Sequence, residues 1–310
     1  MIATVTLNPA LDKTVYIDHL LPNDTNRIKK IETDAGGKGI NASRVLKELG
    51  SETLVFGFLG GRIGRQIENE LKHEGVPTDF VWIAGETRTN ISVQETSGAP
   101  PTMLNEPGPT ISAPDLERLK QKVGEVGAKS DFVLLGGSPS PGVPKDIYFE
   151  LCNIAGCFGA KVILDSDGEP MRLGIECAPF MIKPNRDEVR RLVGIDIRGL
   201  DDGVKALGML RDKGIELVVI SMGAKGAIAG NSDGVWNAVP PKVKPVSTIG
   251  SGDSMVAGIA HILCQGGDLG EALRWGTAAG AATAMTNGKE ICKRAQVLEL
   301  LERVEVTKIA

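Results

Sequence analysis

Short apolar runs that alternate with helical segments constrain this chain more than any other feature. The runs are rich in Val, Ile, Leu and Phe, and each has the length of a single strand. They occupy residues 2–7, 53–59, 131–137, 160–166, 180–185 and 216–221. Segments with helical spacing lie near residues 41–49, 64–74, 113–127, 145–157, 186–193 and 201–213. This alternation predicts βαβ units, and therefore an α/β fold whose parallel sheet is covered by helices on both faces.

Three regions depart from the alternation. Residues 13–20 and 26–33 predict an antiparallel pair around a Pro-Asn-Asp turn, and residues 81–84 and 90–96 predict another. These strands carry more polar residues and have no covering helix, so we expect a small separate sheet that projects from the main body. Residues 226–241 predict an antiparallel hairpin at the edge of the main sheet.

The composition argues against several kinds of partner. A net charge of −4 gives the 310-residue chain no overall basic character for nucleic acid or an anionic membrane, and 4% aromatic residues disfavour base stacking. No apolar run approaches the ~18 residues of a membrane span. The N-terminus lacks a basic segment followed by a long apolar stretch, so we expect a cytoplasmic protein. The five cysteines form no CxxC pair and are expected to be reduced thiols.

Polar or acidic residues follow the predicted strands at the edge where parallel sheets bind ligands. They are Asn8, Ser138, Asp165, Ser221, and Asn185 with Glu188 one turn later. Any one of them could be an ordinary turn residue. Together they favour a ligand site along this edge. Asp165 could belong to that site or simply end its strand.

The stretch STIGSGDSMVAGI, residues 247–259, places two glycines and an aspartate at the start of an apolar helix. Gly250 and Gly252 allow a sharp turn and a close approach to a ligand. The unpaired N–H groups at the start of a helix over 253–265 would attract an anion. Asp253 could take part in chemistry there, or could simply cap the helix. The stretch is neither a dinucleotide fingerprint nor a Walker A loop, because GxGxxG and GxxxxGK[ST] are both absent.

A second glycine cluster, DAGGKGINASRVLKELG at residues 34–50, also opens a predicted helix. Asn41 lies in the first turns, where its amide can reach a ligand. The alternative is a glycine-rich turn in which Asn41 is only a helix-start residue. Lys38 has glycines around it, but their spacing is not that of a Walker A loop.

The two glycine motifs resemble the signatures of a known family. AGGKGINAS (35–43) and TIGSGDSMVAG (248–258) are similar to the N-terminal and C-terminal signatures of the PfkB branch of the ribokinase-like sugar kinases. The resemblance covers the whole chain. It implies a ribokinase-like three-layer α/β/α sandwich in a single domain, residues 1–310, with a lid formed by strands within about residues 12–34 and 80–105. It also implies a homodimer joined through the lid.

The resemblance implies an ATP-dependent kinase. Asp253 matches the family's catalytic base, which takes the proton of the acceptor hydroxyl, and the backbone of Gly250, Ser251 and Gly252 would stabilise the moving phosphoryl group. A helix N-terminus lowers the proton affinity of a carboxylate. We therefore expect proton transfer to come late, which a loose phosphoryl-transfer transition state allows.

The same resemblance implies the binding residues. Asn185 and Glu188 match the NxxE motif, which positions Mg²⁺ on the nucleotide phosphates, through water. ATP would be bound by Lys183, Asn185, Ser221, Gly223, Gly226 and Thr248. The sugar would be held by Asp12, Gly36, Gly37, Lys38, Asn41 and Ser138. The substrate's own phosphate would be gripped by Arg27 and Arg88, whose guanidinium forks suit that task.

Further motifs narrow the sugar. TLNPALD, TRTN, LNEPGP, KPNRDE and SMGAKG look most like the 1-phosphofructokinase group, which implies phosphorylation of fructose 1-phosphate at C6 to give fructose 1,6-bisphosphate. Tagatose-6-phosphate kinases and the minor 6-phosphofructokinases are alternatives, and LDSDGE leans towards the latter. Thr25, Lys38 and Met103 depart from the 6-phosphofructokinase pattern. A catalytically silent sugar-phosphate sensor is a different class, and the intact Asp253 and signature glycines argue against it.

Overall fold

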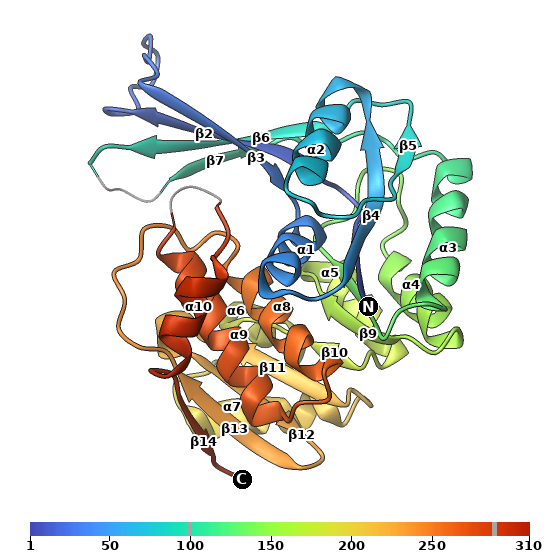
Figure 1. The fold of residues 1–310 in the computed structure, drawn as a ribbon, viewed down its shortest axis with the longest axis vertical. Coiled ribbons are helices and arrows are strands. Elements are labelled where there is room, and N and C mark those ends of the chain that lie inside the picture. The colour runs from blue at the N-terminus through green and yellow to red at the C-terminus, as the bar shows by residue number, and fades with distance from the viewer. Residues whose placement is uncertain (98–100, 287–289) are drawn as a thin grey trace.

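Two β-sheets organise the protein, which is described by a computed structural model over residues 1–97, 101–286 and 290–310 (Figure 1). The strands of the larger sheet, in spatial order, are β14 (Glu305–Lys308), β13 (Gly234–Val239), β12 (Ala227–Asn231), β11 (Leu217–Ser221), β10 (Met181–Ile182), β9 (Lys161–Asp165), β8 (Phe132–Gly136), β1 (Ile2–Thr6), β4 (Thr53–Gly60) and β5 (Val81–Ile83). Strands β11 through β5 are parallel, and β12, β13 and β14 are antiparallel. The predicted parallel sheet and the β12–β13 hairpin are confirmed, but β14 covers the edge that the hairpin was expected to form.

Helices cover both faces of the larger sheet. Alternate residues of each central strand enter one of two cores, as Val133 and Phe132 do, so both faces are apolar. One face carries α1 (Lys38–Leu49), α2 (Gly61–His73), α8 (Ser251–Cys264), α9 (Leu269–Ala284) and α10 (Arg294–Leu301). The other carries α3 (Ala113–Gly127), α4 (Ile147–Cys157), α5 (Gly168–Gly174), α6 (Arg186–Val193) and α7 (Leu200–Arg211). The three-layer α/β/α sandwich is therefore confirmed.

The smaller sheet projects from the main body at the upper left of Figure 1. Its order is β3 (Lys30–Gly36), β2 (Ala10–Ile17), β6 (Arg88–Glu95) and β7 (Thr102–Asn105). The separate sheet and the antiparallel β2–β3 pair agree with the prediction. The β6 strand pairs in parallel with β2 and antiparallel with β7. The expected lid segment 80–105 includes residues 98–100, which lie outside the described residues.

The predicted antiparallel pair of residues 81–84 with 90–96 is wrong. Strand β5 instead extends the larger sheet, parallel to β4, with Phe58 opposite Val81. Val81 is buried in the core that α3 and α4 cover. Burial of this short apolar run against the main body therefore outweighs its closeness in sequence to β6.

Helices α8 and α9 pack closely because glycines face one another. A β-carbon on Gly258 would lie 2.8 Å from the carbonyl oxygen of Trp275, and one on Gly276 would lie 2.7 Å from that of Met255. Neither position has room for a side chain. This contact fixes the start of α8, where the candidate site lies. Among the described helices, none is both long and apolar enough to cross a membrane.

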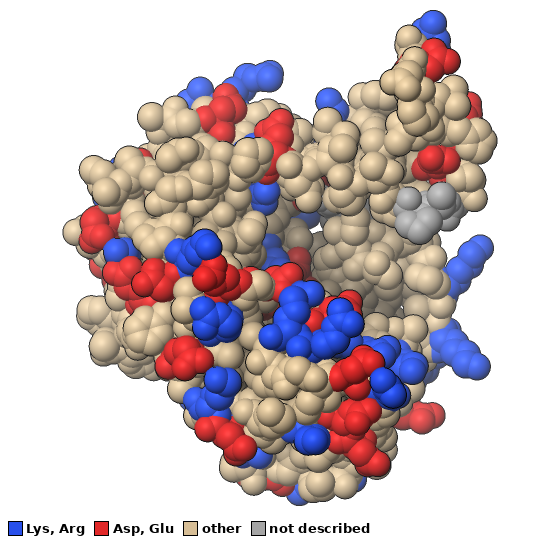
Figure 2. Space-filling view, turned by 180° about the vertical axis from the view of Figure 1, so that it is seen from behind, with Lys and Arg blue, Asp and Glu red and all other residues tan. Residues whose placement is uncertain are grey.

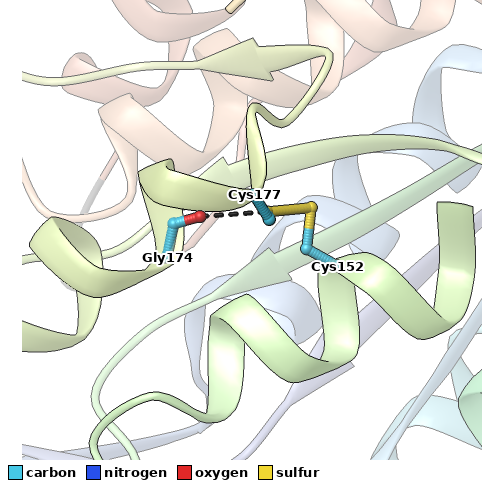
Figure 3. The surroundings of a disulfide bond; sticks show 3 residues. All are labelled: Cys152, Gly174 and Cys177. Carbon is cyan, nitrogen blue, oxygen red and sulfur yellow. Dashed lines mark hydrogen bonds between the residues drawn. A yellow bond between two sulfur atoms is a disulfide. The ribbon is translucent and has the colours of Figure 1, made fainter. Parts of the chain in front are cut away.

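A disulfide links α4 to the short 3₁₀ helix η1 (Ile175–Cys177) that follows α5. Figure 3 shows the bond between Cys152 and Cys177. The Cα atoms of the two residues are 6.5 Å apart. The prediction that all cysteines are reduced thiols is therefore wrong for this pair. The two residues are 25 positions apart, and only the packing of α4 beside η1 brings their sulfurs together. Cys157, Cys264 and Cys292 are free.

We expect thiol titration to count three free cysteines in protein that is denatured without a reductant. Treatment with a reductant before titration should raise the count to all five cysteines of the chain, because it opens the Cys152–Cys177 bond. A Cys152→Ser variant should give four thiols whether or not it is reduced. Five thiols in the unreduced wild type would contradict the disulfide.

Candidate active site

The start of α8 brings the two glycine motifs together. Gly250 is the N-cap residue in a left-handed conformation, φ 79°, and no side chain caps the helix. Asp253 does not serve as the N-cap. Its Oδ2 accepts a 2.8 Å hydrogen bond from Asn41 Nδ2, and its Oδ1 lies 3.4 Å from Lys38 Nζ. Since Lys38 and Asn41 belong to α1, three predicted site residues from distant parts of the sequence meet here.

Burial makes Asp253 a stronger base than its position at a helix start suggests. Its side chain is 9% exposed. Burial raises the pKa of Asp253 above its ordinary value, and the charge of Asp165 adds to this; Lys38, Lys183 and the Asn41 hydrogen bond oppose it without cancelling it. Desolvation is the largest effect on this carboxylate, so its pKa lies above the ordinary value, whereas the helix N-terminus alone would lower it.

Asp165 lies behind this group, at the end of β9. Its side chain is 2% exposed, and its Oδ2 accepts a 2.9 Å hydrogen bond from Lys38 Nζ. Lys183 Nζ, from the segment after β10, lies 3.5 Å from Asp165 Oδ1. Burial raises the pKa of Asp165, but the two ammonium groups outweigh it and hold the pKa below its ordinary value. Sequence reasoning left this residue open; its signal was a lone carboxylate at the end of a buried strand.

Strand β2 of the smaller sheet carries Asp12 to the start of α1. Asp12 is buried and its Oδ1 accepts a 2.9 Å hydrogen bond from Asn90 Nδ2. A β-carbon on Gly36 would lie 1.9 Å from Asp12 Oδ2, so a side chain there would displace the Asp12 carboxylate. Gly37 has φ +132°, and a β-carbon would lie 2.6 Å from Thr6 Cγ2. These glycines let the chain pass closely between the two sheets and present the first turn of α1.

The two predicted phosphate-gripping arginines lie in different places. Arg88 is partly buried at the start of β6 and donates 2.9 Å hydrogen bonds to the backbone oxygens of Glu106 and Asn8. Within the part of the chain that the structure describes, its buried Nε has no hydrogen-bond partner. Burial lowers the pKa of Arg88, although nearby carboxylates oppose this. Arg27 is exposed in the connection from β2 to β3, at the end of the smaller sheet far from the main body. Ser138 is exposed just beyond β8.

The NxxE motif forms a capping box at the start of α6. Asn185 Oδ1 accepts a 3.0 Å hydrogen bond from the Glu188 N–H, and Glu188 Oε2 accepts a 2.8 Å bond from the Asn185 N–H. Burial raises the pKa of Glu188. The two side chains are therefore held side by side at the start of α6, close in sequence to Lys183. Their role in capping α6 is enough to explain the spacing of the two residues.

The loop after β11 closes tightly beside the segment that precedes α6. Ser221 N–H donates to the Pro184 oxygen at 3.0 Å, and Met222 N–H donates to the Gly226 oxygen at 2.7 Å. Gly226 has φ +88°, and a β-carbon there would lie 1.9 Å from the Ala238 oxygen. Gly223 is also left-handed, φ 61°. Thr248 is exposed before the start of α8. Figure 2 shows a hollow on the back of the molecule, with Lys, Arg, Asp and Glu side chains along its lower edge.

This fold and site are those of a sugar kinase family. The chain matches the pfkB family carbohydrate kinases over residues 5–295 and belongs to that family. It is 34% identical to the 1-phosphofructokinases of Borreliella burgdorferi and Bacillus subtilis, over 100% of this chain and 99% and 100% of theirs. The structure of Phosphofructokinase-2 from Escherichia coli in complex with potassium is similar with a TM-score of 0.92 and 30% identity, covering 97% of this chain and 98% of that one.

Proposed function

We propose that this carbohydrate kinase transfers the γ-phosphoryl group of ATP to the C6 hydroxyl of fructose 1-phosphate, which yields fructose 1,6-bisphosphate and ADP. The observation that carries the proposal is the buried Asp253 at the start of α8, hydrogen-bonded to Asn41 and facing Lys38. The full-length likeness to relatives named 1-phosphofructokinase supports the choice of sugar.

The residues of the α8 start divide the chemistry between them. Asp253 accepts the proton of the C6 hydroxyl, and its raised pKa suits this task. The backbone N–H groups of Gly250, Ser251 and Gly252 stabilise the charge on the moving phosphoryl oxygens. The Asn41 hydrogen bond fixes the orientation of the carboxylate towards the hydroxyl.

The nucleotide is bound by residues that follow β10 and β11. Lys183 contacts the phosphates, the loop of Ser221, Gly223 and Gly226 covers the nucleotide, and Thr248 lies beside it. Asn185 and Glu188 would hold Mg²⁺ beside the nucleotide phosphates. Among the described residues no three His, Cys, Asp or Glu side chains cluster as a metal site, so phosphate oxygens and water would supply most of its ligands. The ion would neutralise the phosphate charge during transfer.

The smaller sheet acts as a lid over the sugar. It carries Asp12 and Arg88, which would hold a sugar hydroxyl and the substrate phosphate, and Gly36, Gly37 and Ser138 would complete the pocket. Closure would exclude water, which competes as a phosphoryl acceptor. Arg27 would reach the substrate phosphate only if its connection moves towards the site.

A second copy of the chain would pair with this lid to form a homodimer. Large apolar side chains are exposed on the smaller sheet and the connection at its end: Leu20, Leu21, Ile28, Ile31, Met103 and Leu104. Such a patch on a small sheet favours an interface between proteins. Sedimentation of a monomer at micromolar concentration would contradict the dimer.

We place the enzyme in the cytoplasm, where ATP and sugar phosphates are available.

Side-by-side assays of ADP release test the proposed function. We expect fructose 1-phosphate to have a kcat/KM at least about tenfold above fructose 6-phosphate and tagatose 6-phosphate, a difference of ~1.4 kcal/mol. The likeness to Phosphofructokinase-2 from Escherichia coli, whose structure in complex with fructose-6-phosphate is similar, makes preference for fructose 6-phosphate the second candidate. Chelation of Mg²⁺ should abolish turnover, and added Mg²⁺ should restore it. An enzyme that turns over none of the three sugars would refute the proposal.

A further inference from the structure

We propose that Asp165 is a positioning residue for phosphoryl transfer, whose buried carboxylate holds the ammonium groups of Lys38 and Lys183 on two sides of the reacting atoms. The inference rests on the proposed function and deepens it. Asp165 ends β9 with a side chain only 2% exposed, and its two carboxylate oxygens each face a different lysine, at 2.9 Å and 3.5 Å. These lysines come from elements far apart in the sequence, so Asp165 is the group that fixes their relative positions.

The two lysines face different reactants. Lys38 Nζ lies 3.4 Å from Asp253 Oδ1, on the side of the acceptor hydroxyl. Lys183 Nζ lies against the start of α8, 3.4 Å from where a β-carbon on Gly252 would be, on the side of the nucleotide phosphates. Positive charge therefore lies on both sides of the place where the hydroxyl and the phosphoryl group would meet. Fixed charges of this kind stabilise a transferring phosphoryl group without reorganisation.

Asp165 binds Lys38 more tightly than it binds Lys183, and this difference suits the positioning role. The Lys38 ammonium donates a hydrogen bond to Oδ2, which holds it firmly beside Asp253. Asp165 Oδ1 has no hydrogen-bond partner in residues 1–97, 101–286 and 290–310, and its contact with Lys183 Nζ is an ion pair at 3.5 Å. Lys183 is thus free to donate to a phosphate oxygen while Asp165 still keeps it at the site.

The cluster is balanced in charge, with two ammonium groups against the carboxylates of Asp165 and Asp253. Glu188, from α6, adds a further negative charge that acts on Lys38. Near the start of α8, Asn41 of α1 and Thr283 of α9 are neutral neighbours. Removal of one buried charge leaves its partner uncompensated, which is far more costly than removal of both.

Kinetics of an Asp165→Asn variant give the first test. The variant keeps the shape of the side chain and loses its charge, so the lysines are released and kcat should fall about 100-fold. The KM for the sugar should change less than about threefold. The control is Asp167→Asn, which removes an exposed carboxylate two residues away that binds Arg191, and it should keep wild-type kcat. An Asp165→Asn variant with wild-type kcat would overturn the proposal.

The pH profile of kcat/KM gives a readout that a merely structural role would not move. Activity needs ionised Asp253, so the acid limb follows its pKa, and the substrate phosphate titrates identically for every variant. Lys38 lowers that pKa and Asp165 raises it. The acid limb should therefore move to higher pH in Lys38→Met, and also in Asp165→Asn, because release of Lys38 from Asp253 outweighs the loss of the Asp165 charge. Limbs that coincide with wild type in both variants would contradict the positioning role.

Thermal unfolding tests the cluster independently of any activity. Asp165→Asn should lower Tm by about 5–10 °C, because it leaves the buried Lys183 ammonium group without its carboxylate. The double variant Lys183→Met/Asp165→Asn removes both buried charges of this pair and should recover at least half of that loss. Recovery of none of it would overturn the coupling even if wild type phosphorylates no tested sugar. If the wild type is active but the double variant recovers none of the lost Tm, the role of Asp165 is refuted and the proposed function still stands.

Discussion

An Asp253→Asn variant is expected to lose about 10³-fold in kcat, because general-base catalysis contributes roughly 10²–10⁴-fold. Asn cannot take the proton of the acceptor hydroxyl, yet its amide oxygen can still accept the hydrogen bond from Asn41 that Asp253 accepts at 2.8 Å. Lys38 keeps its stronger partner Asp165, so the fold should survive. Initial rates at saturating ATP and sugar phosphate measure the loss.

Two companion measurements make this result specific. Calorimetric binding of Mg·ATP to the variant should stay within about threefold of wild type, because Asp253 faces the acceptor side. Asp201→Asn, which removes an exposed carboxylate in the first turn of α7, should keep full activity. Near wild-type kcat in Asp253→Asn would mean that another group is the base.

Local patterns predicted the larger sheet well because its central strands are buried on both faces. Continuous apolar runs such as Leu217–Ser221 can hardly lie elsewhere. The failures lie where pairing is decided by distant partners. Strand β5 has three residues and was placed by its contact with β4, and β14 was missed because its residues are mostly exposed at the sheet edge. The parallel β2–β6 pair joins segments about 78 residues apart, which no local turn specifies.

The candidate site also has features that the sequence predicts and features that depend on distant parts of the chain. The glycine motifs and Asp253 stand out in the sequence because a tight turn before an apolar helix needs unusual residues, and the structure brings Asp253 to Asn41 and Lys38. The role of Asp165 could not be read from sequence, since Lys38 lies 127 positions away. Likewise, the balance between burial and the helix N-terminus at Asp253 depends on how the surrounding elements exclude water. Sequence supplies the direction of the helix effect but not the size of desolvation.

Arg88→Met is expected to raise the KM for fructose 1-phosphate by about 100-fold, with kcat and the KM for ATP changed less than threefold. A hydrogen-bonded pair with a charged group contributes ~1.5–3 kcal/mol, which is roughly 10–150-fold in binding. Arg88 is a partly buried arginine on the lid, and its Nε has no hydrogen-bond partner among the described residues. A substrate phosphate would supply one. Arg88→Lys keeps the charge but loses the fork, so its KM should lie between the two.

A sugar that lacks the phosphate separates this role from a structural one. Arg88 also donates to the backbone oxygens of Asn8 and Glu106, so its loss could disturb the lid as a whole. If it acts on the substrate phosphate, wild type and Arg88→Met should phosphorylate free fructose with equal kcat/KM, however slowly. If the variant loses activity on fructose and on fructose 1-phosphate by the same factor, the arginine supports the lid and another group must bind the phosphate. Arg65→Met, on the exposed face of α2, should leave both substrates unaffected.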